Sequence, residues 1–381
     1  MKFRVERDVL ADAVGWAARS LPTRPPLPVL AGLLVEATDA GLVLSSFDYE
    51  VSARVEVDAQ ISDPGRALVS GRLLAEIVRS LPNKPVDVVV DDAKVVLTCG
   101  SSRFALLTLP VEDYPALPDL PAAAGTLSGA DFATAVATVA IAAGRDDTLP
   151  VLTGIRMEFE GDSLTLAATD RYRLAVRELT WSPQMTDASA VALVQARSLA
   201  ETARSLADAD TVTIALAAGG SGDGLIGFEG SGSAGGEGRK RTTTRLLDGE
   251  FPKYRALLPN ESAAVATLDT ASFIESVKRV ALVAERNTPV RLTFGGEELV
   301  LEAGTGDEAQ ATEAMSASFD GEPLTIAFNP QFLLDGLGAI NDPVARLSFT
   351  TPTKPAVLTA GGDDAAGASY RYLLMPVRLS G

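Results

Sequence analysis

The segment Leu27-Pro28-Val29-Leu30-Ala31-Gly32 returns later in the chain as Leu149-Pro150-Val151-Leu152-Thr153-Gly154. The offset, 149 − 27 = 122 residues, is far longer than the repeat of a solenoid protein. A repeat of this length is a whole domain, so we expect the chain to consist of copies of one unit. A third copy keeps only the middle of the motif, as Thr288-Pro289-Val290.

Each copy begins with an amphipathic segment whose apolar residues lie four apart, on one face of a helix. Two short segments with a period of two follow around a Gly, a pattern typical of a β-hairpin. A second amphipathic segment comes next, and further strands close the unit. The predicted first helices are 9–18, 131–143 and 272–284, and the predicted second helices are 71–81, 196–206 and 330–340.

The order helix, strands, helix, strands predicts an α+β domain in which two helices pack on antiparallel sheets. We expect three such domains, at 1–121, 126–259 and 262–381. The Gly- and Ser-rich stretch 219–238 lies inside the second unit. Its composition cannot form a core, so we expect a mobile excursion between strands.

Composition restricts the chemistry. The chain of 381 residues has no His and one Cys, Cys99. This excludes serine- and cysteine-protease arrangements, His metal sites, zinc fingers and disulfides. We therefore expect neither a metal site nor a cofactor. The net charge of −17 argues against simple adhesion to nucleic acid, although it leaves room for a basic face on an acidic body.

The sequence also predicts no targeting segment. Its first residues, Met1-Lys2-Phe3-Arg4, carry charge where a signal peptide needs an apolar stretch. No run of about 18 apolar residues is present. We expect no membrane association and a cytoplasmic protein.

Two charge patterns are candidates for function. Asp pairs occur at 91–92, 146–147 and 363–364, and such groups hold Mg²⁺ in nucleases. They fall at turns and do not recur between the copies, which favours the turn role of Asp; a metal-dependent nucleic-acid enzyme remains the alternative.

Basic residues seven apart share one helical face. They are Arg72 and Arg79, Arg197 and Arg204, and, in the third unit, Arg279 and Arg286 with Lys278 adjacent.

The chain ends in the run Tyr372-Leu373-Leu374-Met375-Pro376-Val377-Arg378-Leu379. This run is similar to the C-terminal signature of the bacterial sliding clamps, the beta subunit of DNA polymerase III. The resemblance extends over essentially the whole chain, through 1–7, 24–30, 169–174 and 248–255. It implies a non-catalytic ring, built as a head-to-tail homodimer of two three-domain chains. The ring keeps the polymerase on DNA because a closed ring cannot fall off.

The resemblance implies that helices line a hole around duplex DNA, which basic side chains would contact without reading its sequence. The residues implied are Arg24, Arg72, Arg79, Arg145, Arg197, Arg204 and Lys278. Well-studied members place aromatic and amide side chains in the loop that here reads 145–151, so Arg145 is the only candidate there. By family correspondence Phe104 and Leu106 would meet Leu282 and Val283 across the dimer interface.

The resemblance also implies an apolar groove between the second and third domains. It would bind short peptide motifs of the replicative DNA polymerase, the clamp loader and repair proteins, and the protein would be nucleoid-associated during replication. The matching positions are Leu152, Thr169, Arg171, Tyr172, Arg173, Leu174, Pro252, Leu257, Leu374, Met375, Pro376, Val377, Arg378 and Leu379. A paralogous clamp that confers tolerance to a groove-binding inhibitor is a further alternative.

Overall fold

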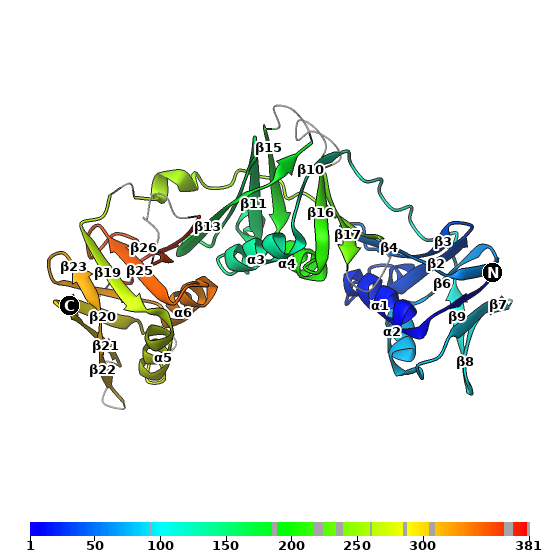
Figure 1. Ribbon diagram of the computed structural model, residues 1–381, viewed down its shortest axis with the longest axis horizontal. Helices are drawn as coiled ribbons and strands as arrows, with labels where there is room; N and C mark the ends of the chain where they lie inside the picture. The colour runs from blue at the N-terminus through cyan, green and yellow to red at the C-terminus, as the bar shows by residue number, and fades with distance from the viewer. Residues whose placement is uncertain are drawn as a thin grey trace.

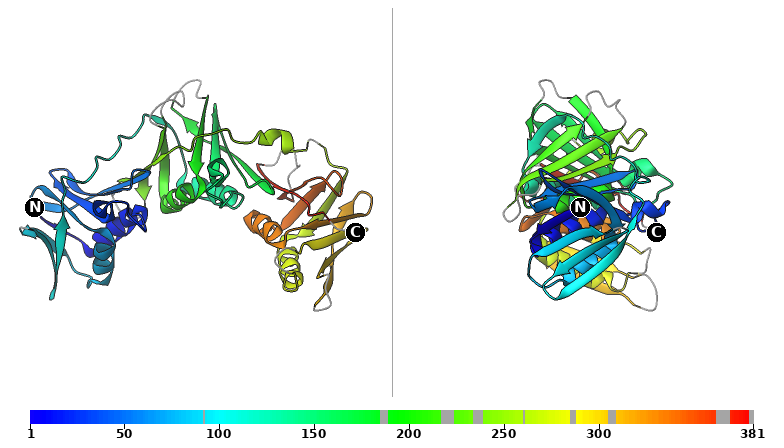
Figure 2. Two further views of the ribbon diagram at one scale, coloured as in Figure 1. Left: turned by 180° about the vertical axis from the view of Figure 1, so that it is seen from behind. Right: turned by 90° about the vertical axis from the view of Figure 1, so that its right-hand side faces the viewer.

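The computed structural model describes residues 1–91, 93–184, 189–216, 224–233, 239–259, 261–284, 288–304, 309–361 and 369–378. Three units follow one another along an arc (Figure 1). The helices lie on the inner side of the arc and the strands form its outer side, as the left view of Figure 2 also shows. The structure therefore confirms three copies of one α+β unit.

The first unit contains two helices that pack against each other and against a curved sheet. Its helices are α1 (Arg7–Ala17) and α2 (Gly71–Ser80), with the 3₁₀ segments η1 (Ala18–Ser20) and η2 (Pro28–Ala31). Its strands are β1 (Lys2–Val5), β2 (Gly32–Thr38), β3 (Gly41–Phe47), β4 (Val51–Val57), β5 (Gln60–Asp63), β6 (Gly65–Ser70), β7 (Val86–Asp91), β8 (Lys94–Cys99) and β9 (Ser102–Leu109).

The second unit repeats this order. Its helices are α3 (Gly129–Ala140) and α4 (Ala196–Ser205), with η3 (Pro150–Thr153) and η4 (Tyr254–Leu257). Its strands are β10 (Ala123–Leu127), β11 (Gly154–Glu160), β12 (Ser163–Thr169), β13 (Arg173–Thr180), β14 (Ser182–Pro183), β15 (Ser189–Gln195), β16 (Ala209–Leu216), β17 (Leu225–Ser233) and β18 (Arg239–Arg245). Strand β10 begins before residue 126, and we keep the three domain boundaries as a proposal.

The third unit has helices α5 (Thr270–Ala281) and α6 (Pro330–Ala339). Its strands are β19 (Ala264–Asp269), β20 (Val290–Gly295), β21 (Glu298–Ala303), β22 (Ala311–Ser316), β23 (Ser318–Asp320), β24 (Leu324–Phe328), β25 (Val344–Phe349), β26 (Ala356–Ala360) and β27 (Tyr370–Leu374). All six predicted helices are present within a few residues of their expected ends.

The equivalent helix positions are equally buried. Val14, Val136 and Val277 lie on the first helix of each unit and are fully buried. Helices α3 and α5 begin at side-chain caps, because Ser128 accepts from the Asp131 N–H and Asp269 from the Ser272 N–H. Apolar burial on one helical face is therefore the shared basis of the three units.

The repeated Leu-Pro-Val-Leu motif forms the same structure twice, the 3₁₀ segments η2 and η3 with Pro at the first position. The Gly that follows starts strands β2 and β11. A Cβ on Gly32 would lie 2.5 Å from the Leu68 side chain, so no larger residue fits there without displacing that side chain. The motif thus turns the chain into the first hairpin of each unit.

The units are joined by strand pairing. Strand β4 of the first unit pairs antiparallel with β18 of the second, and β13 of the second pairs with β27 of the third. The outer wall therefore runs continuously from one unit to the next. A single sequence gives no signal for these pairings, since the paired strands lie nearly 200 residues apart along the chain.

The expectation for the Gly- and Ser-rich stretch is wrong for residues 225–233. These form β17, which pairs with β16 and β18. Ile226 and Phe228 point into the core and are fully buried. A Cβ on Gly227 would lie 2.1 Å from the Leu120 side chain, so this Gly allows close packing on the opposite face. Residues 219–223 and 234–238 of the stretch lie outside the described residues.

Candidate functional site

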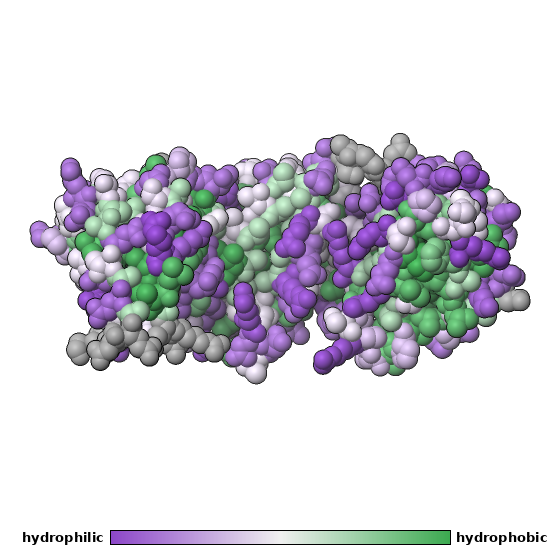
Figure 3. All heavy atoms as spheres, turned by 90° about the horizontal axis from the view of Figure 1, so that it is seen from below, coloured by the Kyte–Doolittle hydropathy of each residue, from purple (hydrophilic) through white to green (hydrophobic). Residues whose placement is uncertain are grey.

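The basic residues predicted for DNA contact are all exposed. Five lie on the helices at the inner side of the arc: two on α2, two on α4 and one on α5. The other two lie in loops, Arg24 before η2 and Arg145 after α3. Seen from below (Figure 3), hydrophilic side chains occupy the middle of the molecule, between apolar patches toward both ends.

Three of these residues have partners within the chain. The Arg72 guanidinium donates to the Pro22 carbonyl at 3.1 Å, and Arg197 pairs with Glu201 at 3.5 Å. Lys278 pairs with Glu275 at 2.9 Å. Both ion pairs are exposed, and exposed ion pairs are weak. The cationic groups therefore remain available to a polyanion on the inner side of the arc.

A pocket lies where the second domain meets the third. It is formed by the loop that follows α3 and leads into η3, by the turn between β12 and β13, and by the first turns of α6. The residues lining it include Arg145, Leu152, Asp170, Tyr172, Phe332 and Asp335. Sequence reasoning anticipated the β12–β13 turn and missed Phe332, Gln331 and Asp335 of α6. The helix was predicted, but its contact with the turn depends on the pairing of β13 with β27.

The turn between β12 and β13 is rigid. The Asp170 carboxylate accepts from the N–H groups of Tyr172 and Arg173, at 3.0 and 3.1 Å. Arg171 has φ = 79°, a left-handed conformation that a non-Gly residue adopts only when its surroundings enforce it. The turn thereby projects Tyr172, which is 59% exposed, with its ring 6.4 Å from that of Phe332.

Arg173 anchors the pocket from beneath. Its side chain is buried and donates to Asp170 at 3.1 Å and to Asp335 of α6 at 2.5 Å. The guanidinium carbon lies 4.3 Å from the centre of the Phe332 ring, within reach of a cation–π interaction. Burial opposes the charge, but Tyr372, Asp335 and Asp170 outweigh it and raise the pKa of Arg173 above its ordinary value.

The C-terminal segment completes this surface. The Met375 N–H donates to the Tyr172 carbonyl, and the Val377 N–H donates to the Ala327 carbonyl. Met375, Val377, Arg378, Arg171, Tyr172 and Leu257 are exposed, and Leu152, Pro252 and Pro376 are partly exposed. Thr169, Arg173, Leu174 and Leu374 are buried and support the exposed residues from below. Leu379 lies outside the described residues. The groove assignment itself stays a prediction.

A carboxylate lies behind the groove, close to η4. Glu158 is buried and accepts from Arg156 at 2.5 Å, from the Tyr254 hydroxyl at 2.9 Å, and from Arg255. Burial opposes its charge, but these three donors outweigh the effect and lower the pKa of Glu158. The cluster holds η4, and so Leu257, against the strand β11.

Apolar residues are exposed at both ends of the arc. On the third domain Leu282 is 84% exposed, and on the first domain Phe104, Leu107 and Leu73 are exposed. Leu106, predicted at the interface, is only 3% exposed and packs in the core of its own domain. Leu107 and Leu73 were not among the residues predicted for the interface. The alternating pattern along β9 shows which residues share a face of the strand. It does not show which face packs on the core of its own domain and which is free to contact a partner subunit.

The Asp pairs assemble no metal site in the part of the chain that the structure describes, where no three acidic, His or Cys side chains cluster. Asp146 instead accepts from the backbone N–H and the hydroxyl of Thr148. Asp92 and the pair 363–364 lie outside the described residues. Likewise, no described helix is long and apolar enough to span a bilayer.

Comparison with known proteins identifies all three units. Family models for the DNA polymerase III beta subunit match with their N-terminal domain at residues 1–118, their central domain at 126–253 and their C-terminal domain at 255–378. The beta sliding clamp of Streptomyces coelicolor is 62% identical over 383 residues, covering 100% of both chains. The beta sliding clamp homolog GriR of Streptomyces muensis is 46% identical, covering 99% of both.

Solved structures agree over the full length. The DNA polymerase sliding clamp of Bacillus subtilis superposes with a TM-score of 0.90 at 25% identity, covering 100% of both chains. The clamp of Pseudomonas aeruginosa bound to griselimycin superposes with a TM-score of 0.90 at 28% identity, again covering 100% of both.

Proposed function

The chain belongs to the family of the DNA polymerase III beta subunit, the sliding clamps, and from this premise we propose which of its surfaces close the ring, guide DNA and bind partners. The protein is a non-catalytic processivity factor of DNA replication. We assign closure, guidance and partner binding to three separate surfaces.

Ring closure is supported by the two junctions inside the chain, which share one register. Ala53 of β4 lies opposite Thr242 of β18, and Ala175 of β13 lies opposite Tyr372 of β27. Thr242 and Tyr372 occupy equivalent positions in their units. Thr242 lies opposite the buried Phe228 of β17, and Tyr372 lies opposite the buried Leu358 of β26. The chain therefore joins consecutive domains twice by the same strand pairing.

At each end of the arc, the position equivalent to one side of this junction has no second partner strand among the described residues. Phe104 of β9 lies opposite the buried Leu97, and Ala311 of β22 lies opposite Ala303. Strand β9 pairs with β6 only at Thr108 and Leu109, and β22 is the last strand of its sheet among the described residues. Repeating the junction a third time would place Ala311 opposite Phe104 of the partner subunit.

We infer a head-to-tail homodimer from this match, since each chain offers one edge of each kind and two copies close the circle. The apolar residues beside the two edges support it. Leu282 and Val283 follow α5, Phe104 and Leu107 lie on the open part of β9, and Leu73 lies on α2. Their burial would give the interface an apolar centre.

Duplex DNA would pass along the inner side of the arc. Arg24, Arg72, Arg79, Arg145, Arg197, Arg204 and Lys278 supply positive charge there, while the chain as a whole carries −17. This distribution favours sequence-independent contacts with phosphates and limits adhesion of DNA elsewhere.

The surface between the second and third domains would bind peptide motifs of the polymerase, the clamp loader and repair proteins. Tyr172, Leu257, Met375 and Val377 offer exposed apolar groups on a rigid frame, and Met adapts to several sequences. We place the protein in the cytoplasm, at the nucleoid during replication. The higher identity to the Streptomyces coelicolor beta sliding clamp than to the clamp homolog GriR supports a replicative clamp over a paralogue.

Cysteine cross-linking tests the register. Directly opposed residues in an antiparallel pair have Cα atoms about 4.5–5.5 Å apart, within the range of a disulfide. The double variant Ala311→Cys with Phe104→Cys should form a covalent dimer on oxidation. The matched control, Ala311→Cys with Arg103→Cys, is one residue out of register and should cross-link far less. Equal or reversed yields would contradict the proposed closure.

A further inference from the structure

A short segment links the second domain to the third and carries the helical turn η4, on the outer side of the arc (Figure 1). Phe251 and Tyr254 of this segment are buried in one apolar cluster with Leu174 and Leu373, which pair with each other across the β13–β27 junction. Leu257 ends η4 and is 52% exposed. The segment therefore crosses the junction at which we place the proposed groove, with one apolar side chain exposed.

A cluster of charged and hydroxyl groups fixes η4 to the second domain. The Glu158 carboxylate of β11 lies at its centre and is buried. It accepts from Arg156 of the same strand, and from the Tyr254 hydroxyl and the Arg255 guanidinium of η4. Two of the four residues of η4 are thus bound to one carboxylate. Directed hydrogen bonds to one anion fix the orientation of a short turn as well as its place.

The other two units have no such cluster in the part of the chain that the structure describes. The position two residues before the end of the first hairpin strand is Glu36 in β2, Glu158 in β11 and Thr293 in β20. Glu36 takes part in none of the side-chain hydrogen bonds or ion pairs of the described residues, and Thr293 shares an exposed hydrogen bond with Thr325 of β24. The fold of one unit therefore does not require a buried carboxylate at this position.

The first unit holds its own linking segment by apolar contacts. Leu34 occupies the position of Arg156, and it is buried with Val111 and Tyr114 of the segment that leaves the first domain. A buried ion pair is often no more stabilising than well-packed apolar side chains of similar volume. Stability therefore does not explain why the second unit has charged groups where the first has Leu34.

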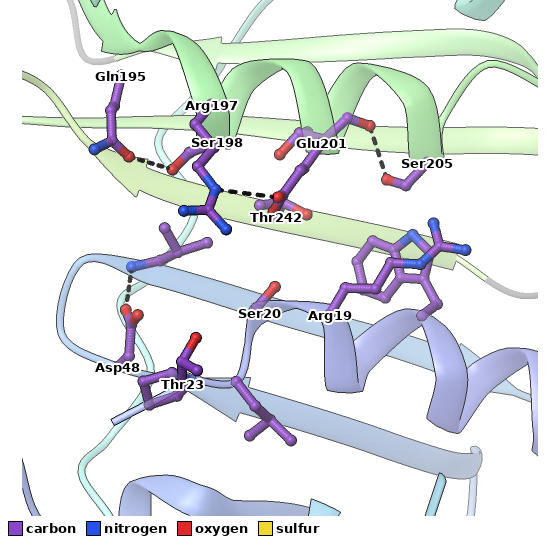
Figure 4. A pocket seen from close by; sticks show the side chains of 15 residues that line it. Arg19, Ser20, Thr23, Asp48, Gln195, Arg197, Ser198, Glu201, Ser205 and Thr242 are labelled. Carbon is purple, nitrogen blue, oxygen red and sulfur yellow. Dashed lines mark hydrogen bonds and ion pairs between the residues drawn. The ribbon is translucent and has the colours of Figure 1, made fainter. Parts of the chain in front are cut away.

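The two junctions also differ in what they can bind. A pocket where the first domain meets the second has the same construction as the one described above, since the equivalent turns contain the two left-handed non-Gly residues of the described chain, Tyr49 (φ = 74°) and Arg171 (φ = 79°). Counted from the starts of α4 and α6, Ser198 stands where the other pocket has Phe332. Most side chains around the pocket between the first and second domains are hydroxyl, amide or charged groups (Figure 4). The aromatic surface and the cluster around Glu158 therefore occur at the same junction.

A fixed η4 favours the binding of a peptide that covers Leu257. Ordering a mobile segment on binding costs free energy, and a site that is already ordered does not lose it. The rings of Phe251 and Tyr254 keep the segment on the sheet, but apolar contacts have no preferred direction. The hydrogen bonds to Glu158 supply that direction, so they determine where the exposed Leu257 lies.

We propose that Glu158 is a positioning residue of the proposed groove. It holds η4 from behind and thereby fixes Leu257, so it raises the affinity for partner peptides without touching them. Glu158 is buried and does not line the pocket between the second and third domains, so its effect reaches the peptide through η4. The inference rests on the proposed function, because the place of Leu257 in the groove is part of that proposal.

Removal of the carboxylate charge tests this role. The intact dimer is titrated calorimetrically with a synthetic peptide of the clamp-binding segment of the replicative polymerase. Glu158→Gln keeps the size of the side chain and should weaken the affinity for the peptide by about fivefold. Tyr254→Phe removes one donor, keeps the buried ring, and should weaken the affinity by about twofold.

Glu160→Gln is the matched control. Glu160 lies two residues further along the same strand, is exposed, and has its carboxylate 3.9 Å from the Arg255 guanidinium. The variant removes the same charge outside the buried cluster, so it should bind the peptide as the wild type does. A Glu158→Gln protein with wild-type affinity would overturn the proposal, and so would an equal loss of affinity in the two variants.

Double variants separate positioning from general damage to the fold. In a Leu257→Ala background, Glu158→Gln should cost almost no further affinity, because the side chain that η4 presents has already been removed. In a Tyr172→Ala background the loss should remain about fivefold, since Tyr172 belongs to the turn between β12 and β13 and not to η4. An equal loss in the two backgrounds would overturn the proposal, because the effect would not pass through Leu257.

The outcomes distinguish this proposal from the proposed function. If Leu257→Ala and Tyr172→Ala weaken peptide binding while Glu158→Gln binds as the wild type does, the groove stands and the positioning role of Glu158 is wrong. If the wild-type dimer does not bind the peptide, or if both Ala variants bind it as well as the wild type, the groove assignment is wrong and the positioning role falls with it.

Discussion

Arg173 of the second domain and Asp335 of the third form an ion pair at 2.5 Å, directly beneath the exposed ring of Tyr172 and the partly buried ring of Phe332. The pair therefore fixes the relative position of two domains and the floor of the proposed partner surface at once. The equivalent positions at the junction of the first and second domains are Val51 and Glu201, so this link is specific to one junction.

Asp335→Asn should destabilise the chain. The substitution removes the negative charge opposite the buried Arg173 guanidinium and leaves only a neutral amide oxygen as its cross-domain acceptor, at an expected cost of about 2 kcal/mol in free energy of unfolding. Urea unfolding measures it. Glu275→Gln, which removes the exposed partner of Lys278, is the control and should change stability by less than about 0.5 kcal/mol. Equal effects of the two would show that the cross-domain pair is as weak as a surface one.

Tyr172→Ala should weaken binding of a peptide from the polymerase's clamp-binding segment by about tenfold, since an exposed aromatic anchor contributes roughly 1–2 kcal/mol. Calorimetric titration of the peptide gives the affinity. Met375→Ala should act in the same direction. Val191→Ala removes a comparably exposed apolar residue from β15, outside the proposed groove, and should leave the affinity unchanged. A loss of affinity in Val191→Ala alone would move the site elsewhere.

Leu282→Asp should convert the dimer into monomers, because a charge at the centre of an apolar interface cannot be solvated there. Native mass spectrometry reports the change. Leu257→Asp places the same charge on an exposed Leu of the proposed groove and should leave the dimer intact. A dimeric Leu282→Asp protein would contradict the proposed interface.

Acid should weaken the cluster around Glu158 that holds η4 against β11. The pKa of Glu158 is lower in the folded chain than in the unfolded chain, where a Glu has a pKa of about 4.3. Its stabilising contribution is therefore complete above the unfolded pKa and is lost as the pH falls through the folded pKa. The free energy of unfolding of Glu158→Gln should be lower than wild type at neutral pH and approach it in acid. A gap that is constant with pH would argue against ionisation as the cause.

The sequence predicts local structure well because each unit carries its own pattern. Periodicity locates all six helices, and the Leu-Pro-Val-Leu repeat locates the hairpins that follow the first helices. The pattern fails at Leu225–Ser233, where Gly residues permit close packing instead of preventing a core. Composition alone does not distinguish a Gly in an irregular segment from a Gly in a strand where a neighbouring side chain leaves no room for a Cβ.

The sites are less predictable, because they lie between units. Tyr172 is recognisable within its turn, but Phe332 joins it only because β13 pairs with β27, a pairing that no local pattern encodes. Leu107 and Leu73 become candidates only once the open edge of β9 is known. The equivalence of the two junction pockets is visible in sequence as the offset of 122 residues between their turns, but the contacts of α4 and α6 with those turns are not.

Retention on DNA tests the central claim most directly. Protein loaded onto a nicked circular duplex should stay bound through gel filtration in moderate salt, and cutting the circle once should release it, because a closed ring escapes only over a free end. Equal retention on the circle and on the linear product would contradict the account, since it would show that contacts, and not topology, hold the protein on DNA.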